Sequence, residues 1–189
     1  MCIRDSLKSN GETLTLLNAG GVMVTSFRVD AGNVWSETAN SGGHSLVLAH
    51  PELGLENPEA WRASVQPYGT PGTSDATVFA GDPLADADHD GVPALLEYAM
   101  GTSDNDAGQG PHMAQGGIDG EGWFILTLPR SLAADDVRIR VEVSDDLQSW
   151  SPAVPRVRRV TGEGQGLETW GTPPSARRAV FLRASVQRW

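Results

Sequence analysis

A twelve-residue segment near the middle of the chain constrains its structure more than any other. Asp86-Ala-Asp88-His-Asp90-Gly91-Val-Pro-Ala-Leu-Leu-Glu97 places acids and a glycine at every specified position of the calcium-loop pattern D-x-[DN]-x-[DN]-G-x5-E. Alternate residues of a tightly curled loop point towards one centre, and glycine takes the sharp turn that a Cβ would hinder. The segment therefore predicts a loop closed around one Ca²⁺ ion.

The expected metal ligands are side-chain carboxylates and one backbone carbonyl. They come from Asp86, Asp88, Asp90, Val92 (its carbonyl) and Glu97 (both oxygens). Ala94 has no side-chain oxygen, so a water is expected at its position. His89 is expected to point outward, because imidazole is a poor partner for Ca²⁺. Hard oxygen ligands in this number favour Ca²⁺ over Mg²⁺. The alternative is a solvated acidic loop that binds no ion.

The residues around the loop predict a helix on one side only. Residues 93–100 form a two-turn pattern, with Pro93 at the first helical position and Gly101 at the exit. Gly81 and Pro83 argue against a helix that enters the loop. The result is half of an EF-hand.

This single-helix, EF-hand-like loop resembles those of dockerin repeats and thrombospondin type 3 repeats. Dockerins use two such loops. The only candidate for a second begins at Asp104-Asn-Asp106, but Gly108 and the lack of a closing glutamate spoil it. A cohesin-docking role is therefore disfavoured.

Most of the remaining chain predicts β-structure, because Gly (22) and Pro (12) are abundant and helical periodicity is scarce. Asn18-Ala-Gly-Gly21 separates two alternating runs, as in a hairpin. The other expected strands are 44–48, 123–128, 137–143, 154–160 and 179–186. In the third of these runs, Val137, Ile139, Val141 and Val143 are expected to share one face.

The first part of the chain resembles the closing part of a lamin-tail domain. The matching segments are Gly11–Leu17, Gly21–Phe27, Trp35, Ser45–Leu48, Trp61–Ser64 and Gly69–Gly72. The resemblance implies a partial immunoglobulin-like β-sandwich of the kind found in secreted bacterial proteins. The opening strands of the family are missing from the match, which leaves an open edge and an uncovered core.

The last part resembles a C-terminal β-module common in large secreted bacterial proteins, through Glu142-Val-Ser-Asp-Asp-Leu-Gln-Ser-Trp150. The expected fold is mainly β: a partial sandwich, a short calcium loop and helix, and a small antiparallel β-module. The expected organisation is an adapter-like start (1–6), the lamin-tail-like part (7–74), a linker (75–85), the calcium loop and helix (86–101), a flexible loop (102–120) and the C-terminal module (121–189).

Composition excludes several classes of protein. The net charge of −10 disfavours nucleic-acid binding. No apolar run approaches the ~18–20 residues that span a bilayer. Met1–Ser6 resembles a translated sequencing adapter, so the natural reading frame is expected to start upstream; this segment includes Cys2, the only cysteine. The six Trp residues are expected to fill cores, with a sugar-stacking platform as the alternative.

The sequence thus predicts a non-catalytic accessory segment of a secreted or cell-surface bacterial protein, with Ca²⁺ stabilising an inter-module joint. No G-x-S-x-G, H-E-x-x-H, P-loop or G-x-G-x-x-G motif in a suitable context indicates an enzyme. The alternative is a tail that binds substrate or surface for an exported hydrolase whose catalytic domain lies upstream. Its partner would be a polysaccharide or another cell-surface component.

Overall fold

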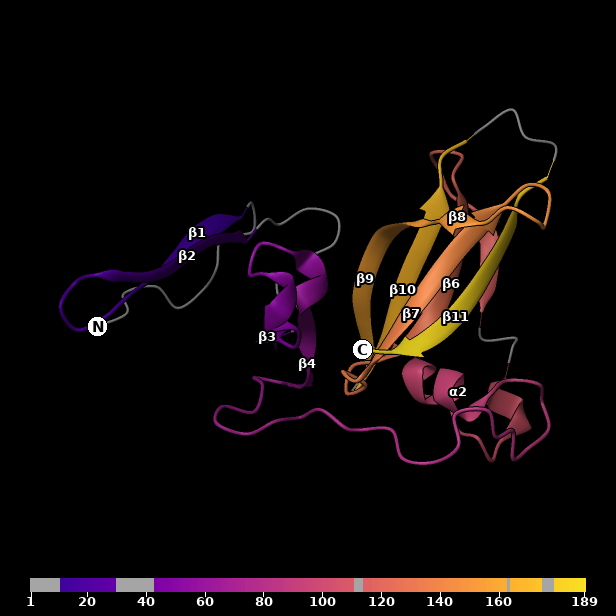
Figure 1. The fold of residues 1–189 in the computed structure, drawn as a ribbon, viewed down its shortest axis with the longest axis horizontal. Coiled ribbons are helices and arrows are strands. Elements are labelled where there is room, and N and C mark those ends of the chain that lie inside the picture. Colours follow the sequence, from indigo (N-terminus) through magenta and orange to yellow (C-terminus); the bar gives the residue numbers. More distant parts are fainter. Residues whose placement is uncertain (1–10, 30–42, 111–113, 163, 175–178) are drawn as a thin grey trace.

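The computed structural model describes residues 11–29, 43–110, 114–162, 164–174 and 179–189 (Figure 1). Within these ranges the chain is mainly β, with one short α-helix, as the sequence predicts. The adapter-like start and Trp35 lie outside the described residues.

Two separate hairpins precede the linker. β1 (Glu12–Leu17) pairs with β2 (Met23–Val29), and β3 (His44–Leu48) pairs with β4 (Trp61–Pro67), both antiparallel. The Asn18 side chain closes the first turn by accepting hydrogen bonds from the N–H groups of Gly20 and Val22. Two short 3₁₀ turns, η1 (Pro51–Leu53) and η2 (Pro58–Ala60), connect β3 to β4. Stacking of Phe27 on Trp61, with ring centroids 5.3 Å apart, joins the hairpins.

The C-terminal module contains two antiparallel sheets (Figure 1). One has the strand order β5-β6-β10-β9, and the other has the order β11-β7-β8. The strands are β5 (Gln115–Ile118), β6 (Phe124–Ser131), β7 (Val137–Ser144), β8 (Ser151–Pro152), β9 (Val154–Gly162), β10 (Gln165–Thr172) and β11 (Phe181–Arg188).

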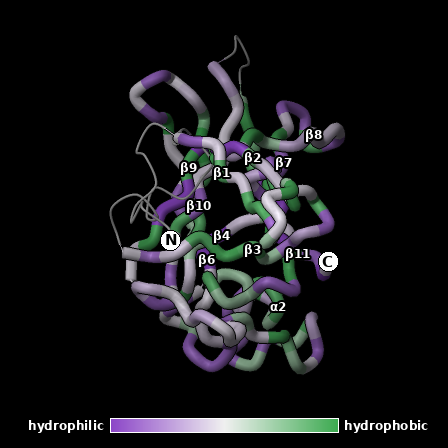
Figure 2. Tube along the Cα trace, turned by 90° about the vertical axis from the view of Figure 1, so that its left-hand side faces the viewer, coloured by the Kyte–Doolittle hydropathy of each residue, from purple (hydrophilic) through white to green (hydrophobic). Residues whose placement is uncertain are grey.

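The core of this module lies between the two sheets and the helix α2 (Ala94–Met100). Leu128 and Trp170 come from one sheet, and alternate residues of β7 come from the other. All four predicted inward-facing residues of β7 are buried. Leu95, Ala99 and Met100 of α2 complete the cluster. Figure 2 shows hydrophobic stretches, in green, along α2 and the neighbouring strands.

Two parts of the module differ from the sequence prediction. Residues 102–120, expected to be a loop throughout, contain a 3₁₀ turn, η3 (Ala107–Gln109), and strand β5. β5 reads Gln-Gly-Gly-Ile, a composition with little strand propensity; it pairs in register with β6, from Gln115 opposite Thr127 to Ile118 opposite Phe124. β10 was also not anticipated, and it lies between β6 and β9.

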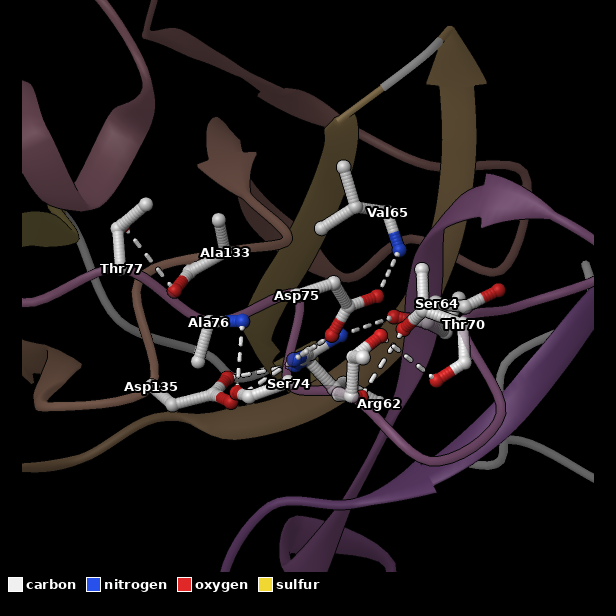
Figure 3. A network of polar contacts seen from close by, with 12 residues as sticks. Arg62, Ser64, Val65, Thr70, Ser74, Asp75, Ala76, Thr77, Ala133 and Asp135 are labelled. Carbon is white, nitrogen blue, oxygen red and sulfur yellow. Dashed lines mark hydrogen bonds and ion pairs between the residues drawn. The ribbon is translucent and has the colours of Figure 1, made fainter.

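A network around Arg62 joins the second hairpin to the C-terminal module (Figure 3). The guanidinium of Arg62, on β4, donates to Asp75 in the linker at 2.6 Å and to both carboxylate oxygens of Asp135, before β7, at 2.6 and 2.9 Å. The second oxygen of Asp75 accepts the N–H of Val65. Burial favours the neutral form of Asp75, but the bonds from Arg62 and Val65 and the Arg62 charge outweigh it, so the Asp75 pKa is lowered.

The linker then runs along the C-terminal module. The N–H of Thr77 donates to the carbonyl of Ala133, and the N–H of Phe79 donates to Asp136 Oδ2. Tyr98 of α2 donates its hydroxyl to Asp136 Oδ1 at 2.8 Å and packs edge-on against Phe79. The linker and α2 therefore share one anchor, Asp136, on the module.

Candidate metal centre

The acidic loop is curled by hydrogen bonds from its own backbone. Asp86 accepts the N–H groups of Asp90 and Gly91, one on each oxygen, at 3.2 and 3.1 Å. Asp88 Oδ1 also accepts the Asp90 N–H, and Asp90 Oδ1 accepts the Val92 N–H at 2.7 Å. These bonds turn the carboxylates inward, and one oxygen of each lies within 4.8 Å of those of the other two.

Two residues of the loop, His89 and Gly91, have a left-handed backbone conformation with positive φ. Gly91 has φ +90°, a conformation that L side chains rarely adopt. His89 has φ +62°, and its side chain is exposed to solvent, outside the carboxylate cluster. The exit of the loop closes onto its entrance, because the N–H of Ala94 donates to the carbonyl of Ala85 and that of Leu95 to the carbonyl of Pro83.

Glu97 lies in the first turn of α2, and its side chain is fully buried, with 0% exposure. Its Oε1 accepts a hydrogen bond from Thr102 Oγ1 at 3.2 Å. Burial raises the Glu97 pKa to about 7; the Thr102 bond opposes this rise, and the charges of Asp88, Asp90 and Asp104 add to it. With a pKa of about 7, the carboxyl group of Glu97 would be partly protonated at neutral pH unless a cation paired it.

Three buried carboxylate oxygens have no hydrogen-bond partner among the described residues. They are Asp88 Oδ2, Asp90 Oδ2 and Glu97 Oε2. A buried polar atom without a partner costs roughly 1–3 kcal/mol, and more when it is charged. Oxygens in this state are suited to binding a hard divalent cation, which would both pair and neutralise them.

Of the five predicted ligands, the structure groups Asp86, Asp88 and Asp90 directly. Burial is the main cause of the raised pKa of Glu97, and the charges of Asp88 and Asp90 add to it. Val92 follows Gly91 with its side chain buried in the core of the C-terminal module, which anchors the loop there.

The motif did not identify Asp104, whose side chain contacts the backbone of the loop. Its Oδ1 accepts the N–H of Ala87 at 3.1 Å, between the first two ligands of the loop. In the sequence, Asp104 begins an incomplete second copy of the pattern, and it lies outside the twelve residues of the first copy. The only sequence signal for this contact is the position of Asp104, a few residues after the predicted helix that carries Glu97.

The described Trp residues are poorly arranged for sugar stacking. Trp170 is buried in the core, and Trp61 stacks on Phe27. Arginines cover the other three rings: Arg156 over Trp123, Arg183 over Trp150 and Arg138 over Trp189. Their arrangement favours roles in packing over an open platform.

Comparisons with protein-family models, with curated proteins and with solved structures found no match for this chain. In the part of the chain that the structure describes, no helix is long and apolar enough to cross a membrane.

Proposed function

We propose that residues 86–97 bind one Ca²⁺ ion through Asp86, Asp88, Asp90, the Val92 carbonyl and Glu97. The observation that carries this proposal is the fully buried Glu97, whose Oε2 has no partner among the described residues and faces the charges of neighbouring carboxylates. A solvated acidic loop would leave its carboxylates in water, where they need no cation. Burial of several carboxylates becomes favourable once a divalent ion pairs them.

The ion acts as a structural clamp in this proposal. It joins the end of the linker, at Asp86, to Glu97 on α2, whose apolar face packs in the C-terminal core. The other end of the linker is held by Asp75, which pairs with Arg62 of the second hairpin. Calcium would therefore stiffen the segment that connects the hairpins to the C-terminal module.

This role fits a non-catalytic accessory segment of a secreted or cell-surface multidomain protein. Calcium sites of extracellular modules have Kd values of about 10⁻⁴–10⁻³ M, and they are substantially filled at extracellular calcium levels. A ligand that binds only the folded state stabilises it by RT ln(1 + [L]/Kd), so even a weak site would strengthen the joint.

The test is a thermal melt of the full chain with calcium and with a chelator. At a calcium concentration 100 times Kd, binding adds about 2.7 kcal/mol, which raises Tm by roughly 5–10 °C in a protein of this size. Asp88→Ala should abolish the rise. Asp82→Asn, a charge-removing change at an exposed aspartate just before the loop, should retain it. Equal Tm values for the parent protein in calcium and chelator would show that the site is wrong.

A further inference from the structure

Asp104 reaches the candidate metal centre from outside the twelve-residue loop. It lies in the segment that follows α2, and its side chain is half-buried. The hydrogen bond from the Ala87 N–H to Asp104 Oδ1 spans 17 residues of sequence and fixes the carboxylate beside the loop entrance. A carboxylate that only capped its own turn would bond to the residues that follow it, as Asp106 does with Gly108.

The carboxylate of Asp104 lies beside the first two predicted ligands of the loop, because the Ala87 N–H that it accepts at 3.1 Å lies between Asp86 and Asp88. Asp86 accepts backbone N–H groups of the loop on both of its oxygens, whereas Asp104 uses only Oδ1 in its contact with the loop.

The twelve-residue loop leaves one place in its coordination sphere without a protein ligand. Position nine is Ala94, which carries no side-chain oxygen. The segment that contains Asp104 also packs tightly against the loop further on, because a Cβ on the buried Gly110 would lie 1.8 Å from Asp90 Oδ2. Two segments, 86–97 and 104–110, thus enclose the same group of oxygens.

We infer that Asp104 is a further calcium ligand, binding through Oδ2 and replacing a water that Ala94 would otherwise leave in the sphere. The inference rests on the proposed function. It makes the site a two-segment clamp: the ion ties the linker, α2 and the stretch leading to β5 together, and a fifth carboxylate increases the affinity.

The experiment uses the full chain, Ca²⁺ titration by calorimetry, and Eu³⁺ as a luminescent substitute for Ca²⁺. Decay lifetimes in H₂O and D₂O count the waters on bound Eu³⁺. Asp104→Ala should weaken Ca²⁺ binding about tenfold or more and add one water to bound Eu³⁺. Asp104→Asn keeps an acceptor for the Ala87 N–H but loses the charge, so it should also bind Ca²⁺ more weakly. Asp106→Asn, an equal charge change on the exposed side of the same segment, should alter neither measurement.

Three results would overturn the inference. Unchanged affinity in both Asp104 variants would remove Asp104 from the site while leaving the proposed function standing. Weaker binding of Asp104→Ala with an unchanged water count, together with parental affinity in Asp104→Asn, would make Asp104 a positioning residue. A parent protein that binds neither ion would overturn the proposed function as well.

Discussion

Gly110 lies against the carboxylate of Asp90, so closely that a Cβ at residue 110 would stand 1.8 Å from Asp90 Oδ2 and 2.8 Å from its Cγ. Asp90 Oδ2 is also one of the three buried oxygens without a partner in the described chain. A backbone twenty residues downstream thus forms one wall of the candidate metal centre. This close approach leaves no room for a Cβ, so it requires glycine at residue 110.

We therefore predict that Gly110→Ala displaces Asp90 from the site. Overpacking of this kind costs about 1–3 kcal/mol, which would lower Tm by several degrees, and calcium affinity should fall with it. The measurements are a thermal melt in chelator and a calcium titration. Gly120→Ala is the matched control, because a Cβ there meets no atom within 4 Å. If both variants bind calcium like the parent, residue 110 does not enclose the site.

Glu97→Gln should separate stability from calcium binding. The amide keeps the shape of the side chain and removes the buried charge, so at about pH 8 in calcium-free buffer the variant should be more stable than the parent by about 1–3 kcal/mol. Calcium should then raise its Tm little or not at all. The exposed Glu56, changed to Gln, serves as the control and should behave like the parent. A Glu97→Gln variant that is less stable than the parent in chelator would contradict the burial argument.

The raised pKa of Glu97, about 7 against an ordinary value of 4.5, also predicts a pH dependence. Between these values the calcium-free folded protein holds a proton that the unfolded chain releases, so its stability should fall as pH rises from about 4.5 to about 7. Calcium replaces that proton, and its stabilising effect should be larger at about pH 8 than at about pH 5.5. Thermal melts of the parent and of Glu97→Gln across this range isolate the contribution of Glu97, because the two proteins differ at no other residue. Parallel curves for the two proteins would refute it.

The Arg62 network predicts a second contribution, independent of calcium, to the stability of the connection between the hairpins and the C-terminal module. Arg62 is 13% exposed and Asp75 is 8% exposed, so Arg62→Met would leave two poorly solvated carboxylates unpaired. Breaking a buried pair in this way costs roughly 3–5 kcal/mol. Arg183→Met removes an arginine that is 51% exposed and pairs with Glu142, and should cost under about 1 kcal/mol. Chemical denaturation measures both losses, and an equal effect of the two changes would show that the network adds little.

The calcium rise in Tm should persist in Arg62→Met, because the network shares no residue with the metal centre. Loss of the rise would mean that the hairpins and the loop are coupled through the linker more strongly than their contacts indicate.

The sequence alone determined the features that depend on local spacing. The hairpin around Asn18, the inward face of β7 and the helix between Pro93 and Gly101 follow from periods of two and 3.6 and from turn residues, and the structure has all three. The acids of the loop are equally local, because Asp86, Asp88 and Asp90 are brought together by bonds within five residues of chain.

Tertiary structure decided everything that joins distant residues. β5 exists through pairing with β6, and Arg62 meets Asp135 across 73 residues. The full burial of Glu97 depends on the packing of α2 against the C-terminal core. Asp104 and Gly110 reach the site because the chain folds back after α2. Spacing along a chain specifies which oxygens can meet within one turn, whereas the burial of carboxylates arises only when separate segments pack.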